Sequence, residues 1–215
     1  MHPTKLDHVA VNVSDPGRVA EALLARLPFR VLEQTDEFTL VGRNPDLGKL
    51  TLVRAGGRPE PGQLLRIGIA VPCATASSSV DVGGELHVEL VPGRRDGEVD
   101  LDHVALRVPD PYASAQRWLE LGFQRADRVG CSERVRLGDA FVELHPGPPA
   151  PTGHPLLGHV GLLVESVDGA RSDAVDAGLE VRRYVEAENS RALFVSGPDE
   201  VEVELVEHLP SFALV

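Results

Sequence analysis

LDHVALRVPDP at residues 101–111 repeats LDHVAVNVSDP at residues 6–16: eight of the eleven positions are identical, although the two stretches start 95 residues apart. The alternating apolar residues predict a strand, and the final Asp-Pro predicts the N-cap and first residue of a helix that follows. A third copy, LGHVGLLVESV at 157–167, and a weaker fourth, LLRIGIAVP at 64–72, extend the series. The repeats indicate a chain assembled from copies of one small unit.

The unit is long enough to hold one helix and four strands in three of its four copies. The repeated strands carry His8, Arg66, His103 and His159, at separations of 58, 37 and 56 residues. Short strand-like runs such as SERVRLG and AFVELHP follow the predicted helices. The second copy has only CATASSSVDVGG between its two strands, which is too short for a helix and two further strands. We therefore expect an α+β fold of tandem βαβββ modules, three full and one shortened, which form two cupped mixed β-sheet domains with helices on the outer face.

The order of the modules suggests two domains. Residues 1–95 contain the full first module and the shortened second one, and residues 100–215 contain the third and fourth. The stretch PGRRDGEVD at 92–100 is typical of a boundary between them. Because the shortened module leaves a sheet edge exposed, a second copy of the chain could cover it, and we expect a possible homodimer.

Composition restricts the class of partner. The formal net charge of −12 argues against nucleic acid and against anionic membrane surfaces. No apolar run approaches the ~18 residues that a membrane span needs, and the opening MHPTKLDH lacks the apolar segment of a secretory signal. Cys73 and Cys131 are too few for a disulfide framework. We expect a cytoplasmic protein whose partner is a small-molecule substrate.

Carboxylates recur on the last strand of the modules. Glu143 in FVELHPG and Glu204 in VEVELVEH lie on the strand face opposite the apolar residues that a helix covers. His103 and His159 lie on the same face of the first strands, 40 and 45 residues before these glutamates. Two imidazoles and two carboxylates in one trough favour a divalent cation, because the cation offsets the repulsion between the acids. The first module has Thr51 in place of the glutamate.

A single histidine or glutamate on a strand is more often structural than a ligand. The recurrence of both residues in register favours the metal site, with His103, Glu143, His159 and Glu204 as ligands. The N-terminal modules carry Arg66 where the others have histidine, so we expect a degenerate, structural pair there, with His8 outside the metal site. In an alternative second site, Glu85, His87 and Glu89, which share one strand face, would hold an ion together with His8.

These residues resemble the vicinal oxygen chelate superfamily, which includes glyoxalase I, bleomycin-resistance proteins and extradiol dioxygenases. The resemblance is carried by LDHVAL at 101–106, LGHVGLLV at 157–164 and SGPDEVEVELVE at 196–207. It implies paired βαβββ modules cupped around a metal, with the four residues above as the ligands of a glyoxalase-like enzyme. His103, His159 and Glu204 alone correspond to the iron triad of the dioxygenases. Glu200 stands where the family has glycine, and Phe194 stands near the position of a dioxygenase tyrosine.

The expected function is a metal-dependent enzyme that acts on a small oxygen-bearing molecule by lyase or isomerase chemistry. One divalent ion (Ni, Zn, Mn, Co or Fe) would stabilise an enolate or alkoxide. The resemblance implies that Glu143 or Glu204 moves protons as the catalytic residue. Two alternatives stay open: an iron(II) dioxygenase that uses His103, His159 and Glu204, and a drug-binding resistance protein without turnover.

Overall fold

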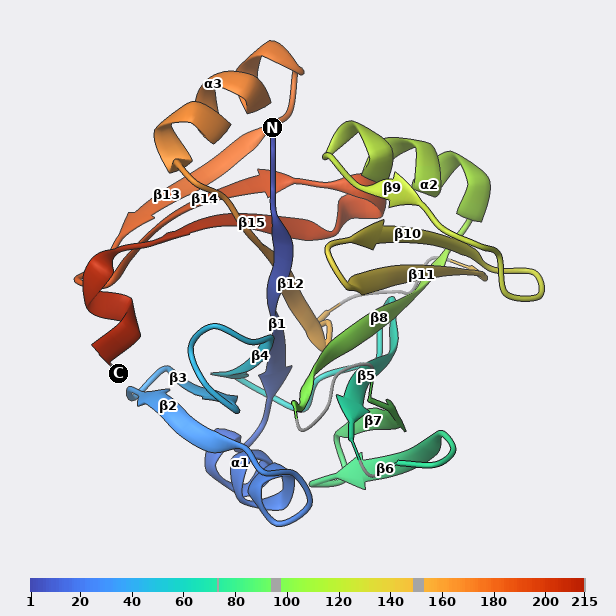
Figure 1. Cartoon of the computed structure of the whole chain (residues 1–215), viewed down its shortest axis with the longest axis vertical. Coiled ribbons are helices and arrows are strands. Elements are labelled where there is room, and N and C mark those ends of the chain that lie inside the picture. The colour runs from blue at the N-terminus through green and yellow to red at the C-terminus, as the bar shows by residue number, and fades with distance from the viewer. Residues whose placement is uncertain (73, 94–97, 149–152, 215) are drawn as a thin grey trace.

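The computed structural model describes residues 1–72, 74–93, 98–148 and 153–214. Within these ranges the chain forms two mixed β-sheets, of eight and seven strands, and three α-helices (Figure 1). This arrangement confirms the expected α+β fold of βαβββ modules. Cys73 and the expected end of the first domain at residue 95 lie outside the described residues.

Each module can be followed along the chain in Figure 1. The first comprises β1 (Lys5–Val13), α1 (Pro16–Leu24), β2 (Arg30–Gln34), β3 (Phe38–Gly42) and β4 (Lys49–Arg54). The second comprises β5 (Leu64–Val71), β6 (Ser78–Val82) and β7 (Leu86–Pro92). The third comprises β8 (Asp100–Val108), α2 (Pro111–Glu120), β9 (Gln124–Arg125), β10 (Glu133–Leu137) and β11 (Ala140–Pro146). The fourth comprises β12 (Leu157–Leu163), α3 (Val167–Asp176), β13 (Val181–Glu186), β14 (Ser190–Ser196), the 3-10 turn η1 (Pro198–Glu200), β15 (Glu202–His208) and the turn η2 (Pro210–Leu214).

Two of the three described helices, α1 and α2, begin where the sequence places their caps, whereas the N-cap of α3 lies two residues before the expected Asp168. The side chains of Asp15 and Asp110 each accept a hydrogen bond from the backbone N–H three residues later, at 3.1 and 3.0 Å. A proline follows each aspartate directly. In the fourth module Ser166 takes this role. The described residues between β5 and β7 form no helix, but the small residues Ser78–Val82 form β6, which the sequence did not predict. None of the described helices is long and apolar enough to cross a membrane.

The modules pair in a nested order and not in sequence. The eight-stranded sheet has the order β13-β14-β15-β12-β1-β4-β3-β2, so the first module pairs with the fourth. The seven-stranded sheet has the order β6-β7-β5-β8-β11-β10-β9, so the second pairs with the third. β1 runs antiparallel to β12, and β5 runs antiparallel to β8. The sheets therefore do not follow the expected division into 1–95 and 100–215, because each takes one module from either side of that boundary.

One face of each sheet belongs to the apolar core. The helices pack there, α1 on β3 and β4, α2 on β10 and β11, and α3 on β14 and β15. A single cluster of buried apolar side chains extends over both sheets and all three helices of the described chain. The opposite face of each sheet carries polar side chains at matching positions. These are His8, Thr51, His159 and Glu204 in the larger sheet, and His103, Glu143, Arg66 and Glu89 in the smaller one.

The larger sheet curls until its two ends meet. Glu33 on β2 and Asn189 in the β13–β14 turn come from opposite ends of the strand order, yet their side chains approach to 3.5 Å. The turn η2 follows β15, and its Phe212 ring stacks on His208 at 3.7 Å between ring centroids. We call this curled sheet the first cup, and the polar face of the seven-stranded sheet the second cup.

A strained turn ties the two sheets together. Asp199 and Glu200 adopt positive φ angles of 55° and 63°, which residues other than glycine rarely adopt. The Asp199 carboxylate pairs with Arg117 of α2, and the Asp199 carbonyl accepts a hydrogen bond from Gln63 at 2.6 Å. Both partners belong to the modules of the smaller sheet. The strain at this turn is therefore maintained by contacts across the sheets.

Substitution of Glu200 by glycine should stabilise the protein. Glycine relieves the left-handed strain, and part of the gain is offset by its greater freedom in the unfolded chain, which leaves roughly 0.5–1 kcal/mol. We expect Glu200→Gly to raise the thermal midpoint by roughly 1–4 °C. Asp199→Gly serves as the control, because it loses the Arg117 contact and should lower the midpoint. A lower midpoint for Glu200→Gly would contradict the assigned strain.

Candidate metal centre

Three side chains meet at the floor of the first cup. His8 extends from β1, His159 from β12 and Glu204 from β15. The two histidine Nε2 atoms lie 3.1 Å apart. A single Glu204 oxygen, Oε2, lies 3.0 Å from the Nε2 of His8 and 2.7 Å from that of His159. Within the described chain, these three residues are the group of histidine, cysteine and acidic side chains close enough to share one ion.

A glycine on the neighbouring strand makes room for the His8 ring. β1 and β12 pair with His8 opposite Gly161. A Cβ atom at Gly161 would lie 2.3 Å from His8 Cε1, which is too close for any residue other than glycine to fit there without moving the ring. The imidazole therefore lies across the backbone of β12, where it reaches His159. Gly68 has the same relation to His103 in the smaller sheet, with a Cβ position 2.2 Å from the ring.

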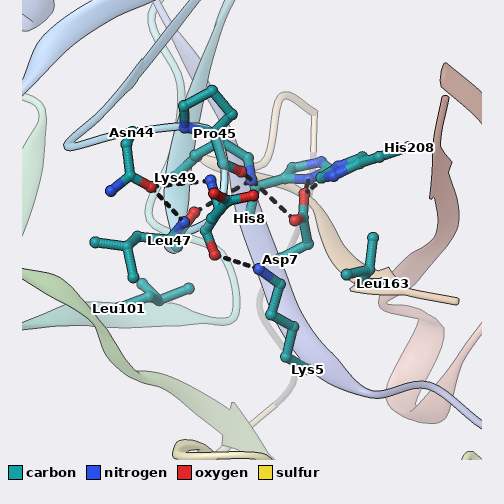
Figure 2. A network of polar contacts seen from close by, with 12 residues as sticks. Lys5, Asp7, His8, Asn44, Pro45, Leu47, Lys49, Leu101, Leu163 and His208 are labelled. Atoms are coloured by element: carbon teal, nitrogen blue, oxygen red, sulfur yellow. Dashed lines mark hydrogen bonds and ion pairs between the residues drawn. The ribbon is translucent and has the colours of Figure 1, made fainter. Parts of the chain in front are cut away.

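Asp7 orients the His8 ring from the same strand. Its Oδ2 lies 2.9 Å from His8 Nδ1, so a proton on Nδ1 leaves the Nε2 lone pair facing His159 and Glu204. Figure 2 shows the Asp7 carboxylate among its partners: it also accepts a 2.8 Å hydrogen bond from the buried Lys49 ammonium, and His208 lies 3.4 Å away. The strand pairing is irregular between Leu6 and His8, which accommodates adjacent residues that both serve the site.

The negative charges of Asp7 and Glu204 favour a cation between the two imidazole rings. Burial disfavours the charged form of His8, but Glu204 and Asp7 outweigh it and raise the His8 pKa to about 9. Burial likewise opposes charge on Glu204, yet the two imidazoles hold the pKa of its carboxyl well below the usual range. Burial lowers the pKa of His159. The raised pKa of His8 favours a proton on His8 beside Glu204, and a metal ion bound between the three side chains would displace that proton.

The size of the triangle fits a divalent metal. A cation about 2.1 Å from three ligands at right angles would separate the ligand atoms by about 3.0 Å. The three observed separations are 2.7, 3.0 and 3.1 Å. Two histidines and one carboxylate on one side of an ion leave further coordination positions open. The residues present thus fit a mononuclear centre with room for substrate oxygens.

A cavity of about 330 Å³ opens above this triangle, at the small end of the range for ligand sites. Thr51 lines it at the register position that Glu143 holds in the other sheet. The cavity wall combines charged and apolar side chains from both ends of the curled sheet and from the turn after it. They include Glu33, Glu37, Phe38, Arg183, Asn189, Phe194, His208 and Phe212.

The four ligands expected from the sequence do not converge. His159 and Glu204 lie in the first cup, whereas His103 and Glu143 lie in the second, with their own partners Arg66 and Glu89. The reason is the nested pairing, which places the third and fourth modules in different sheets. His8, which we expected to lie outside the metal site, takes the place assigned to His103. The alternative site with Glu85, His87 and Glu89 does not form, since His8 lies in the other sheet.

A signal for His8 was present in the sequence. His8 and His103 occupy identical LDHVA segments, so the sequence marked both as candidates. The repeat could not show which of them meets His159. That choice is made by the strand that pairs with β12.

Comparisons with known proteins identify the family of the third and fourth modules. Residues 100–205, which contain these modules, match the Glyoxalase/Bleomycin resistance protein/Dioxygenase superfamily. This region belongs to the superfamily, and the expected resemblance is confirmed. No curated protein sequence matches the chain.

Solved structures agree on the fold over nearly the whole chain. A putative dioxygenase from Bacillus subtilis subsp. subtilis str. 168 superposes with a TM-score of 0.76 at 16% identity, over 99% of this chain and 87% of that one. Glyoxalase I from Zea mays gives a TM-score of 0.71 at 16% identity, over 94% and 92%. At this level of identity the likeness shows a shared fold alone.

The role of Gly161, which leaves space for the His8 ring, can be tested with a matched pair of variants. Gly161→Ala should push the His8 ring away from His159 and weaken binding of added zinc by about 10-fold or more. Gly68→Ala makes the same change beneath His103 and should leave zinc affinity unchanged. Titration against a zinc-binding dye measures both, with circular dichroism as the check on folding. Equal losses in the two variants would contradict the assignment of the site to the first cup.

Proposed function

We propose that this chain is a mononuclear metal-dependent enzyme whose ion is held by His8, His159 and Glu204 and whose substrate is a small molecule with two adjacent oxygens. One observation carries the proposal: two imidazole nitrogens and one carboxylate oxygen form a triangle with edges near 3 Å at the floor of a cavity. Superfamily membership supports it, since a cupped sheet around a divalent metal is what that family implies. The fold likeness to glyoxalase I and to a putative dioxygenase is consistent with it.

Iron(II) is the favoured metal and oxygen-dependent chemistry the favoured class. A facial set of two histidines and one carboxylate with open positions is the arrangement of non-haem iron oxygenases. The bound ion would supply a coordination site for substrate oxygens and for dioxygen. Asp7 would fix the tautomer of His8, and the curled sheet with Phe212 would limit access of water to the cavity.

His208 is the residue best placed to hold a proton beside the substrate. It lines the cavity, stacks on Phe212 and lies 3.4 Å from the Asp7 carboxylate. In extradiol dioxygenases a histidine stands in the stretch before the metal-binding glutamate. The stretch directly before Glu204 has no histidine, but His208, which follows Glu204 in the sequence, lines the same cavity.

Lyase or isomerase chemistry, the first expectation from the sequence, has less support. That chemistry was expected to use two carboxylates, of which the first cup has only Glu204. Thr51 stands in the place of the second, and Glu143 faces the other cup. Binding without turnover is also less favoured, because a resistance protein of that kind has no need of a triad of ligands with open positions.

The test uses iron(II) with nitric oxide as the probe. Protein stripped of metal and loaded anaerobically with one equivalent of iron(II) should bind nitric oxide at an open position and give the half-integer-spin signal of an iron–nitrosyl. His8→Ala and His159→Ala should each lower iron affinity by more than about 100-fold and abolish the signal. Uptake of dioxygen in the presence of a catechol panel then tests turnover.

His103→Ala is the matched control, since it removes the histidine of an identical LDHVA segment in the other sheet. It should retain the metal and the nitrosyl signal. Turnover of a substrate with nickel or zinc but not with iron would contradict the proposed oxygen-dependent reaction and support a lyase or isomerase reaction. Retention of iron by His8→Ala would refute the triad itself.

A further inference from the structure

The second cup repeats the first, position for position. In the first cup, His159 pairs opposite Ala10 of β1, and Glu204 lies opposite the residue two places after His159. In the second, Arg66 pairs opposite Ala105 of β8, and Glu89 lies opposite the residue two places after Arg66. The register therefore makes Arg66 the counterpart of His159 and Glu89 the counterpart of Glu204.

The remaining two positions match as well. His103 is the counterpart of His8, and an aspartate on the same strand, Asp102, lies 2.9 Å from its Nδ1 as Asp7 does for His8. Glu143 occupies the position where the first cup has Thr51. The second cup thus keeps one imidazole and adds a carboxylate, and it differs from an ion-binding set chiefly at Arg66.

The Arg66 guanidinium lies where the shared ion would be. Its Nε is 2.6 Å from Glu89 Oε2, and its Nη2 is 2.8 Å from Glu143 Oε2. Arg134 approaches the other oxygen of Glu143, with its Nε at 3.1 Å. Two guanidinium groups therefore balance two carboxylates, the same positive charge that one divalent cation would supply.

Several buried nitrogens around the carboxylates of the second cup make no hydrogen bond within the described chain, and the Nε2 of His103 is the one that could bind a metal beside both Glu89 and Glu143. The Nε2 of His103 is buried and makes no hydrogen bond within the described chain. It faces Glu89 at 3.5 Å and Glu143 at 3.9 Å. The lone pair or proton of this nitrogen is directed into the carboxylate cluster, as the equivalent nitrogen of His8 is in the first cup.

We propose that Arg66 is a tethered cation that takes the place of a divalent metal in the second cup, and that beneath it lies a latent metal site formed by His103, Glu143 and Glu89. The guanidinium neutralises both carboxylates and fills the space between them, so the native chain binds metal in the first cup only. This inference goes beyond the proposed function, because it concerns a site that takes no part in the reaction.

The experiment adds zinc alone to variants that also carry His159→Ala, which removes a ligand and so prevents metal binding in the first cup. In that background Arg66→His should create a site for one equivalent of zinc, with four ligands. Arg66→Lys, which keeps the positive charge, should bind none, and the zinc affinities of the two variants should differ by at least about 100-fold. Adding Glu143→Gln to the histidine variant should remove the new site.

Folding is followed in the same samples by circular dichroism and by the thermal midpoint with and without zinc. Arg66→Gln in the same background provides a second test, as it removes the cation and leaves three ligands; zinc should raise its midpoint but not that of Arg66→Lys. Folded Arg66→His and Arg66→Gln variants that bind no zinc would overturn the proposal, and so would equal binding by Arg66→Lys. Zinc bound by His159→Ala alone is assigned by adding His8→Ala: loss of that zinc would count against the triad of the first cup, whereas its retention would place it beside Arg66 and overturn the present proposal, which keeps the two failures distinct.

Discussion

The antiparallel pairing of β1 with β12 is the contact on which the candidate centre depends. It places His8 opposite Gly161, where the absence of a side chain lets the imidazole lie across the neighbouring strand and reach His159. The same pairing brings β15 beside the first module through β12, so that Glu204 completes the triangle. Without it, His8 would be separated from His159 and Glu204, which β12 and β15 hold together, just as the predicted ligands His103 and Glu143 are separated from them.

Both cups solve one electrostatic problem in different ways. A carboxylate buried beside imidazoles needs positive charge nearby. In the first cup our proposal assigns that charge to a metal ion; Glu204 is the one carboxylate among the three candidate ligands, and Thr51 takes the position that Glu143 has in the second cup. In the second cup the charge is covalently attached, as Arg66 with Arg134. A mobile cation leaves coordination positions for chemistry, whereas a guanidinium occupies them, and for this reason our proposal places the activity in the first cup.

Much of the fold and two of the three residues of the candidate site could be predicted from the repeats. Strand alternation identified the polar face, and His159 and Glu204 were expected as partners within one module. β6 was missed because its residues, SSVDV, are small and polar, and pairing with β7 is what makes them a strand. His103 and Glu143 were correctly placed together, but their neighbour Arg66 fills the position where we expected an ion.

The sequence by itself determined most of the content of the modules: the caps of α1 and α2, the polar face of the predicted strands and the Asp-His pair that starts two of the modules. Only the tertiary structure decided which modules share a sheet. The physical reason is a degeneracy in the local pattern. His8 and His103 lie in identical segments, and Gly161 and Gly68 leave the same space opposite them. Either histidine fits over either glycine, so local chemistry does not choose between the pairings, and the choice falls to the long-range packing of the two sheets in their common core.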